Sequence, residues 1–153
     1  VKAGHQIDKY KKLDNNNQEN ITSILESAFQ GKLINNYFNG EKKDFYISSC
    51  NRSSIIISYD QDIAYMDKFA VIGSARGEGL GAAMWNRMKA DHKKMFWRSR
   101  STNTINSFYK DVCDGFQKYD EWNIFWIGIN DLKELTGCIE YAVSQPETIT
   151  YEK

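Results

Sequence analysis

The stretch of chain from residue 70 to residue 81 constrains the fold more than any other. A short apolar run, Ala70-Val71-Ile72, is followed by Arg76-Gly77-Glu78-Gly79-Leu80-Gly81 and then by an apolar pattern with helical spacing. This order predicts a strand, a glycine-rich turn and the start of a helix. Alternate glycines allow positive φ, and the N–H groups at the start of a helix attract anions. The turn is therefore a candidate phosphate-binding site.

Other uses of glycine-rich turns fit the spacing less well. A dinucleotide-binding turn reads G-x-G-x-x-G, with an acidic residue about 20 positions later. Gly77, Gly79 and Gly81 stand at the wrong spacing for it, and the Gly-Lys-Ser/Thr of a P-loop does not follow. A plain glycine-rich loop between a strand and a helix remains open when the turn is considered alone.

The overall composition limits the classes of function. The chain has 153 residues, enough to bury an ordinary core, and its 20 basic and 20 acidic residues cancel. A nucleic-acid-binding protein usually carries a basic excess, so no nucleic-acid partner is expected. The sequence contains no run of 18 apolar residues that could span a membrane. Because it starts at Val1 with no methionine or targeting segment, we expect a domain taken from a longer protein.

The cysteines and histidines do not indicate a metal site. Cys50, Cys113 and Cys138 are widely spaced and form no C-x-x-C pair, which favours a reduced intracellular compartment over a zinc site. His5 and His92 lie far apart, and neither has a ligand motif around it. We therefore expect two surface histidines and no metal.

Hydrophobic periodicity divides the chain into alternating helices and strands. Residues 1–18 are polar, so we expect a segment or linker there, a first ordered element near Gln18, and a folded domain over residues 19–153. A helix should then run to Gly31, and residues 44–50 and 54–59 should form a hairpin. The other expected elements are strands over 63–72, 95–99 and 122–128, helices over 79–93 and 131–143, and a short helix or turn over 103–109. This alternation predicts a layered α/β domain.

Two motifs flank the glycine-rich turn and make the signal specific. Tyr65-Met66-Asp67-Lys68-Phe69 runs into it, and Phe96-Trp97-Arg98-Ser99-Arg100 follows its helix, with Asn103, Asn106 and Tyr109 beyond. Together with the R-x-x-G-x-G spacing of the turn, these motifs resemble the acetyltransferase domain of N-acetylglutamate synthase and the related domain of fungal-type acetylglutamate kinases. The resemblance covers residues 60–130 well and extends weakly to Pro146. Threonine and serine replace prolines that often follow the two asparagines in the family, which affects loop rigidity more than chemistry.

The resemblance implies a fold, an activity and a co-substrate. The fold would be the GNAT acetyltransferase fold, an α/β architecture with a mixed, mostly antiparallel central sheet flanked by helices. The activity would be transfer of acetyl from acetyl-CoA to the amino group of L-glutamate, in arginine biosynthesis or in production of a urea-cycle activator. Two alternatives stay open: a non-catalytic regulatory domain beside a kinase, and a GNAT enzyme of unrelated amine specificity. The complete set of motif residues favours the synthase activity.

The same resemblance implies where the coenzyme binds. A backbone N–H near Ala70 or Val71 would polarise the acetyl carbonyl, a role that requires no side chain. The residues implied to bind acetyl-CoA are Ala70, Val71, Arg76, Gly77, Glu78, Gly79, Leu80 and Gly81.

Lys68 and Arg98 are the candidates for the two carboxylates of glutamate. A guanidinium inside the apolar strand around Arg98 is costly to bury alone, and a carboxylate is its natural bidentate partner. The alternative for Lys68 is a side chain that extends to solvent at a strand end. The alternative for the arginines is an internal salt bridge, which we expect of Arg100 rather than Arg98.

Asn103 and Tyr109 complete the candidate site. Asn103 is implied to contact substrate, and it could also cap the short helix that follows. Tyr109 is implied to be the general acid that protonates the departing thiolate, because a phenol with a pKa of about 10 is a poor base at neutral pH. The alternative for Tyr109 is a buried core residue. No side chain stands out as the base, so we expect a chain of water molecules.

The family also implies partners outside this sequence. We expect L-glutamate as the acceptor, a preceding amino-acid-kinase-like domain that holds any arginine site, and a homo-oligomeric full-length protein. The compartment would be the mitochondrial matrix in a eukaryote and the cytoplasm in a bacterium, with no membrane partner.

Overall fold

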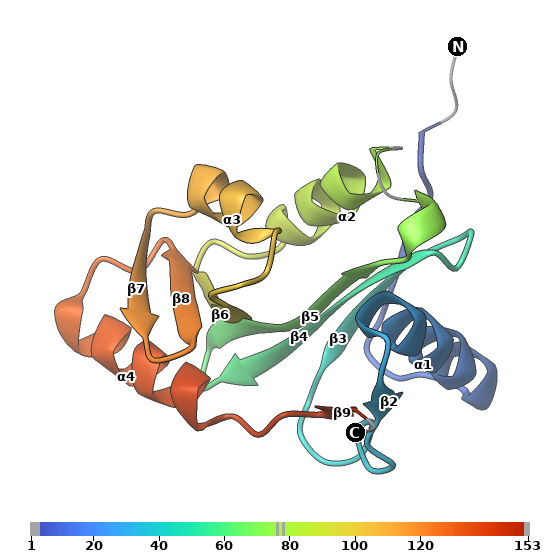
Figure 1. Ribbon diagram of the computed structural model, residues 1–153, viewed down its shortest axis with the longest axis horizontal. Helices are drawn as coiled ribbons and strands as arrows, with labels where there is room; N and C mark the ends of the chain where they lie inside the picture. Colours follow the sequence, from blue (N-terminus) through green and yellow to red (C-terminus); the bar gives the residue numbers. More distant parts are fainter. Residues whose placement is uncertain (1–3, 76, 78, 152–153) are drawn as a thin grey trace. The chain divides into compact units, whose positions relative to one another are not determined.

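The computed structural model of the chain describes residues 4–75, 77 and 79–151 (Figure 1). Its helices are α1 (Asn15–Phe29), α2 (Leu80–Lys89), α3 (Asn106–Val112) and α4 (Leu132–Ser144), with a short 3-10 helix, η1 (Gly73–Ala75). Its strands are β1 (Ile7–Tyr10), β2 (Lys32–Leu33), β3 (Asp44–Ser48), β4 (Ser53–Asp60), β5 (Ile63–Val71), β6 (Met95–Arg100), β7 (Gly115–Tyr119), β8 (Trp122–Ile127) and β9 (Ile149–Thr150).

The main sheet is mixed and mostly antiparallel, as predicted. Its seven strands have the order β1-β3-β4-β5-β6-β8-β7, and β2 pairs separately with β9. β5 and β6 run parallel, whereas β1–β3, β3–β4, β6–β8 and β7–β8 are antiparallel pairs.

The chain forms two compact units. The first contains residues up to 57, residues 68–91 and residues from 147 onward, and the second contains residues 58–67 and 92–146.

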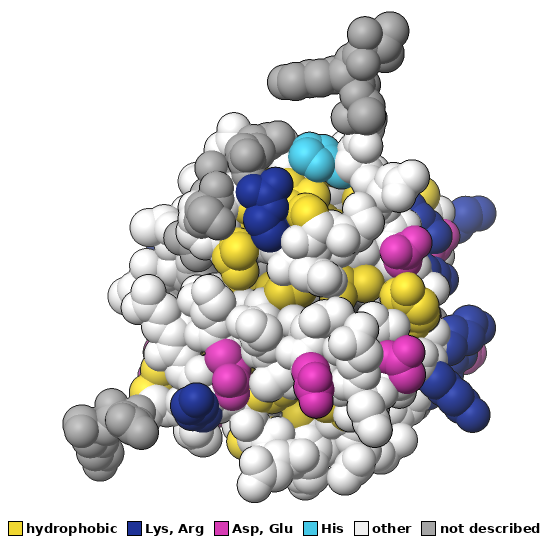
Figure 2. Space-filling model, turned by 90° about the vertical axis from the view of Figure 1, so that its right-hand side faces the viewer, with side chains coloured by type: hydrophobic (Ala, Val, Ile, Leu, Met, Phe, Trp, Pro, Cys, Tyr) yellow, Lys and Arg dark blue, Asp and Glu magenta, His cyan; other side chains and the backbone are white. Residues whose placement is uncertain are grey.

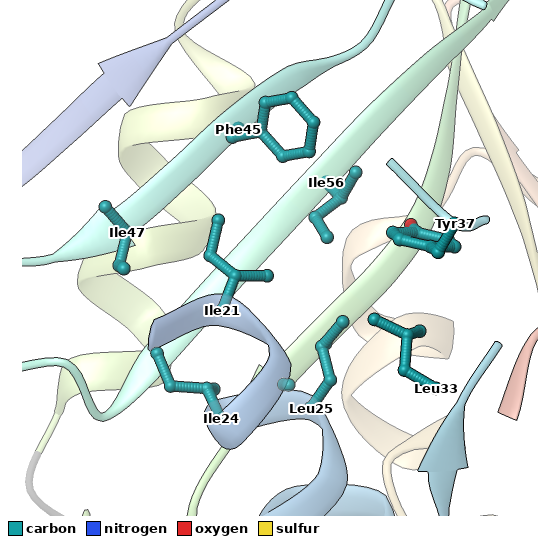
Figure 3. Packing of buried hydrophobic residues seen from close by; sticks show 9 residues of the cluster. Ile21, Ile24, Leu25, Leu33, Tyr37, Phe45, Ile47 and Ile56 are labelled. Carbon is teal, nitrogen blue, oxygen red and sulfur yellow. The ribbon is translucent and has the colours of Figure 1, made fainter. Parts of the chain in front are cut away.

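In the first unit, α1 and α2 lie on opposite faces of β3. The buried face of α1 packs against one set of alternate residues from β3 and β4; the cluster includes Ile21, Ile24, Leu25, Leu33, Tyr37, Phe45, Ile47 and Ile56 (Figure 3). Because side chains alternate along a strand, Tyr46 points to the other face. There its hydroxyl donates a hydrogen bond to Asp91, which follows α2.

The N-terminal part of this unit differs from the prediction. The Asp14 carboxylate accepts a hydrogen bond from the backbone N–H of Asn17 at 2.7 Å, so α1 begins at Asn15 rather than near Gln18. β1 precedes the helix and pairs with β3. The expectation that no ordered element precedes Gln18 is therefore wrong. The four residues of β1 are half polar and depend on pairing with a distant strand, so local periodicity does not reveal them.

In the second unit, α3 and α4 lie on opposite faces of β6 and β8. Trp97 of β6 stacks on Phe125 of β8 with ring centroids 5.5 Å apart, and Tyr109 of α3 closes this cluster. On the other face, Phe96 packs with Tyr65 and with Tyr141 of α4. The large aromatic side chains thus build two small cores, and Trp97 is fully buried in one of them.

Most of the predicted elements are present, with shifted ends. The hairpin, the strands at 63–72, 95–99 and 122–128 and the last helix are confirmed. α2 ends at Lys89 rather than near Lys93, and α3 begins at Asn106 rather than Asn103. β7 was not expected, because four of its five residues are exposed and it shows no apolar alternation.

A polar cluster ties α2 to the sheet within the first unit. One oxygen of Asp91, Oδ2, accepts hydrogen bonds from Tyr46 (2.6 Å), Arg87 (2.8 Å) and Lys9 (3.1 Å). Burial alone would raise the pKa of Asp91, but these three bonds outweigh it and hold the pKa well below its usual range. Folding therefore gains stability from this carboxylate above its unfolded pKa and loses it as the pH falls through the folded value.

The surface in Figure 2 shows acidic and basic side chains interspersed, with hydrophobic side chains in small separate groups. Nothing on this face resembles a single-sign charge field of the kind that binds nucleic acid.

Gly128 is a position that only glycine can fill. Its φ is +75°, and a Cβ there would overlap the backbone carbonyl oxygen of Lys93. We expect Gly128→Ala to lower the free energy of unfolding by about 2–5 kcal/mol, from backbone strain plus overpacking. Gly137→Ala is the matched control, because this helical position has open space around it and should gain about 0.5–1 kcal/mol. Urea denaturation measures the free energy of unfolding of both variants. Equal values for Gly128→Ala and Gly137→Ala would contradict the prediction.

Candidate active site

The glycine-rich turn belongs to the first unit and joins η1 to α2. Gly77 and Gly79 have φ of +85° and +79°, a region that L-residues with side chains rarely adopt. A Cβ at either position would meet nothing within 4 Å, so the space beside the turn is open. Gly79 is the N-cap of α2 and brings no side chain to the first N–H groups of that helix. The described backbone of the turn therefore fits a phosphate-bearing ligand.

The other predicted coenzyme residues have different surroundings. Arg76 and Glu78 lie outside the described residues. A Cβ at Gly81 would make ordinary contacts, 3.5 Å from Val71 Cγ2, so the fold itself does not demand glycine there. Leu80 is fully buried and anchors the start of α2. The carbonyl oxygen of Ala70 accepts a hydrogen bond from Ser53 Oγ at 2.8 Å, which fixes the end of β5.

Lys68 precedes the turn on β5, within the same unit. Its Nζ donates a hydrogen bond to Thr148 Oγ1 at 2.6 Å and lies 5.4 Å from the centre of the Tyr37 ring. The side chain is half-buried.

Arg98 lies on β6 in the second unit, where its guanidinium reaches the end of α4. It donates to the carbonyl oxygens of Ala142 (3.0 Å), Gln145 (2.8 Å) and Pro146 (3.3 Å), and it lies 4.0 Å from the ring centre of Trp122. These bonds satisfy carbonyls that a helix end leaves without intrahelical partners. A guanidinium has five N–H donors, so this arrangement leaves capacity for a carboxylate.

Arg100 forms the salt bridge that the sequence suggested for it. Its Nη1 lies 3.3 Å from Glu121 Oε1, in a pair that is largely exposed. Arg98 also has a structural role, because its guanidinium donates hydrogen bonds to backbone carbonyls at the end of α4.

Asn103 and Tyr109 belong to the second unit, before and on α3. Asn103 is exposed, and its Oδ1 accepts a hydrogen bond from the N–H of Ile105 at 3.1 Å, which shapes the turn into the helix. Tyr109 is 5 % exposed, with its ring 5.2 Å from that of Trp97 and 5.3 Å from that of Phe125. Burial raises the pKa of the phenol above its ordinary value, so the hydroxyl keeps its proton.

Three residues with clear roles around these side chains were not singled out from the sequence. Asn106 stands in the motif, and its Nδ2 donates to the carbonyls of Arg100 (2.8 Å) and Ser101 (3.3 Å), which holds α3 against the end of β6. Its spacing from Asn103 was the available signal. Thr148 and Tyr37 carry no sequence signal, because their contact with Lys68 joins distant parts of the chain.

The described residues show neither a metal-ligand cluster nor a membrane-spanning helix. Among the described residues, no group of three or more His, Cys, Asp or Glu side chains could hold a metal ion. None of the helices in the described part of the chain is both long and apolar enough to cross a bilayer.

Solved structures of other proteins show which fold the chain adopts. The ribosomal-protein-S18-alanine N-acetyltransferase of Escherichia coli superposes with a TM-score of 0.58 at 13% identity, covering 83% of this chain and 97% of that one. Arabidopsis thaliana Naa50, in complex with the bisubstrate analogue CoA-Ac-MVNAL, gives 0.56 at 13% identity, covering 78% and 96%. At this level of identity the likeness establishes the fold alone, which is that of the GNAT acetyltransferases.

The sequence comparisons then identify the family. The family model of NAT, the N-acetyltransferase of N-acetylglutamate synthase, matches residues 8–145, and the chain belongs to this family. Acetylglutamate kinase of Xanthomonas campestris is 32% identical over 97% of this chain and 36% of its own length. Mitochondrial N-acetylglutamate synthase of Danio rerio is 31% identical over 96% and 29%. The chain thus spans about a third of the length of these relatives.

Proposed function

We propose that this domain transfers acetyl from acetyl-CoA to the amino group of L-glutamate, as the acetyltransferase part of an N-acetylglutamate synthase. One observation carries the proposal. In a chain that belongs to the NAT family, β5 carries Lys68, and after β5 and η1 the chain forms an open turn that holds glycines at positive φ and leads into α2.

The turn would hold the phosphates of the coenzyme. Gly77, Gly79, Leu80 and Gly81 would offer backbone N–H groups at the start of α2, where the helix dipole favours negative charge. Arg76 and Glu78 are proposed for the same site from the motif. A backbone N–H near Ala70 or Val71 would polarise the acetyl carbonyl at the end of β5. When bound, acetyl-CoA supplies the thioester whose acetyl group moves to the amine.

Lys68 and Arg98 would bind the two carboxylates of the acceptor, and Asn103 would add a polar contact. Both cations are held by fixed partners, Thr148 for Lys68 and the carbonyls at the end of α4 for Arg98. A charged group that is already oriented loses less entropy when it binds a carboxylate. Two such cations favour a dicarboxylic amino acid over an amide such as glutamine.

Tyr109 would give its proton to the departing thiolate. Its environment favours the acid form, because burial disfavours the phenolate. The amine must lose a proton before it attacks, and we propose that water carries this proton away, since no described side chain stands out as the base.

A direct assay tests the proposal. The purified protein is expected to acetylate L-glutamate in the presence of acetyl-CoA, and to acetylate L-aspartate and L-glutamine much more slowly. The other candidate is a non-catalytic regulatory domain, favoured by the relatives named acetylglutamate kinase. Coenzyme binding without transfer to any of the three amino acids would support that candidate instead.

The coenzyme site gives a separate prediction. We expect Gly79→Val to weaken acetyl-CoA binding at least about tenfold, because a β-branched residue strains φ of +79° and its side chain obstructs the approach of phosphate to the backbone. Gly40→Val is the matched control, since Gly40 has φ of +95°, open surroundings and a place outside the turn. Calorimetric titration with CoA measures both. Unchanged affinity in Gly79→Val would remove the turn from the site.

The remaining proposals concern the longer protein. An amino-acid-kinase-like domain would precede this one, hold any arginine site, and support a homo-oligomer. The expected acetyltransferase domain covers residues 19–153 and follows a polar segment over residues 1–18. Because β1 pairs with β3, we propose that the domain instead begins near residue 7. The protein would lie in the mitochondrial matrix of a eukaryote or in the cytoplasm of a bacterium.

A further inference from the structure

The hydrogen bond on Lys68 points to a residue that lies outside every motif. We infer that Thr148 is a positioning residue, which sets the direction of the Lys68 ammonium group and thereby the affinity for the acceptor carboxylate. The inference rests on the proposed function and names a determinant of substrate binding within it.

Two contacts fix the end of the Lys68 side chain within the first unit. Nζ donates to Thr148 Oγ1 at 2.6 Å, and the ammonium lies 5.4 Å from the ring centre of Tyr37, which is 4 % exposed. Lysine is a point charge on a flexible four-carbon stem, so a defined direction has to come from its partners. An ammonium has three N–H donors, and the bond to Thr148 fixes the direction of one of them.

The backbone at Thr148 is held in place by contacts that do not involve the Thr148 side chain. The carbonyl oxygen of Thr148 accepts a hydrogen bond from the N–H of Ile34 at 3.0 Å. The following residue, Ile149, pairs with Leu33 in the small sheet of β2 and β9, seen side by side in Figure 1. Leu33 is part of the same core as Tyr37. A change at the hydroxyl should therefore leave this part of the fold in place.

The test replaces the hydroxyl by a methyl group of similar shape. Thr148→Val should raise KM for glutamate about 10- to 150-fold, the range expected for one hydrogen bond to a charged group. KM for acetyl-CoA and kcat should each stay within about twofold of the parent. Thr148→Ser keeps the oxygen and should restore KM for glutamate. Thr150→Val is the matched control, because that hydroxyl lies two residues further along the chain, in β9, and donates to the carbonyl of Lys32.

A double-mutant cycle separates positioning from a general structural effect. If Thr148 acts through Lys68, Thr148→Val should raise KM no further in a Lys68→Met background. The same increase in both backgrounds would overturn the inference, as would a parent-like KM in Thr148→Val. Thermal unfolding of each variant shows whether the fold is intact, and Thr148→Ala provides a second variant if valine is poorly tolerated.

A parent protein that does not acetylate glutamate would overturn the proposed function instead. In that case the hydrogen bond between Lys68 and Thr148 is detected by NMR, without an activity assay. The signal of the Lys68 ammonium protons is assigned by its loss in Lys68→Met. Protons that exchange slowly in the parent and in Thr148→Ser, but quickly in Thr148→Val, would support the positioning role. Equal exchange in all three would contradict it.

Discussion

Replacing Tyr109 by phenylalanine is expected to lower kcat for acetyl transfer to glutamate by about 10²- to 10⁴-fold, the usual contribution of one general acid. Both substrates should still bind with parent affinity, because only a hydroxyl is lost. Steady-state kinetics and calorimetric titration with CoA measure the two effects. Tyr141→Phe is the matched control: it removes a hydroxyl from an aromatic side chain packed on the other face of β6, and it should leave kcat unchanged.

The surroundings of Tyr109 add a prediction about pH. Because burial raises the pKa of the phenol, Tyr109 remains protonated across the pH range in which rates are measured. Its ionisation should therefore produce neither limb of the pH–rate profile. Tyr109→Phe should lower the plateau without moving the limbs. A kcat within about twofold of the parent would assign Tyr109 to core packing with Trp97 and Phe125.

The parts of the fold that the sequence predicted are those with strong local signals. β5 and β6 contain continuous apolar stretches, and α1 and α4 show apolar residues at helical spacing. β1, β2, β7 and β9 were not predicted. β1, β2 and β9 have four or fewer residues and pair with strands elsewhere in the chain, so neither length nor alternation marks them. β7 pairs with the adjacent β8, but it is largely exposed and shows no apolar alternation.

The candidate site shows the same division. The turn and the motif around Arg98 stand out from short spacings in the sequence, and the turn has the positive φ that its glycines predict at positions 77 and 79. The partners that hold the functional side chains were not predictable in the same way. Lys68 and Thr148 are 80 positions apart, and the carbonyls that bind Arg98 are backbone groups, which carry no sequence signature. The local sequence thus indicates which residues could supply the chemistry, whereas the positions of their side chains depend on long-range contacts.

Arg98→Ala is expected to lower kcat/KM for glutamate by roughly 2–5 kcal/mol, or about 30- to 4000-fold, because a bound carboxylate would lose its charged partner in a partly desolvated place. Binding of acetyl-CoA should persist. The structure predicts a second loss, since Arg98 also holds three carbonyls at the end of α4 and packs on Trp122. The variant should therefore also have a lower Tm, and kinetics have to be measured well below it.

Two controls separate substrate binding from the structural contribution of Arg98. Arg100→Ala removes an arginine that packs on the same Trp122 ring, at 4.5 Å, and forms an exposed salt bridge with Glu121, so kcat/KM should stay within about threefold of the parent. Arg98→Lys keeps the charge but loses the planar fork, and it should recover only part of kcat/KM. If Arg98→Ala is less stable yet keeps the parent KM for glutamate, the role of the guanidinium is to stabilise the end of α4. The second carboxylate of glutamate must then bind elsewhere.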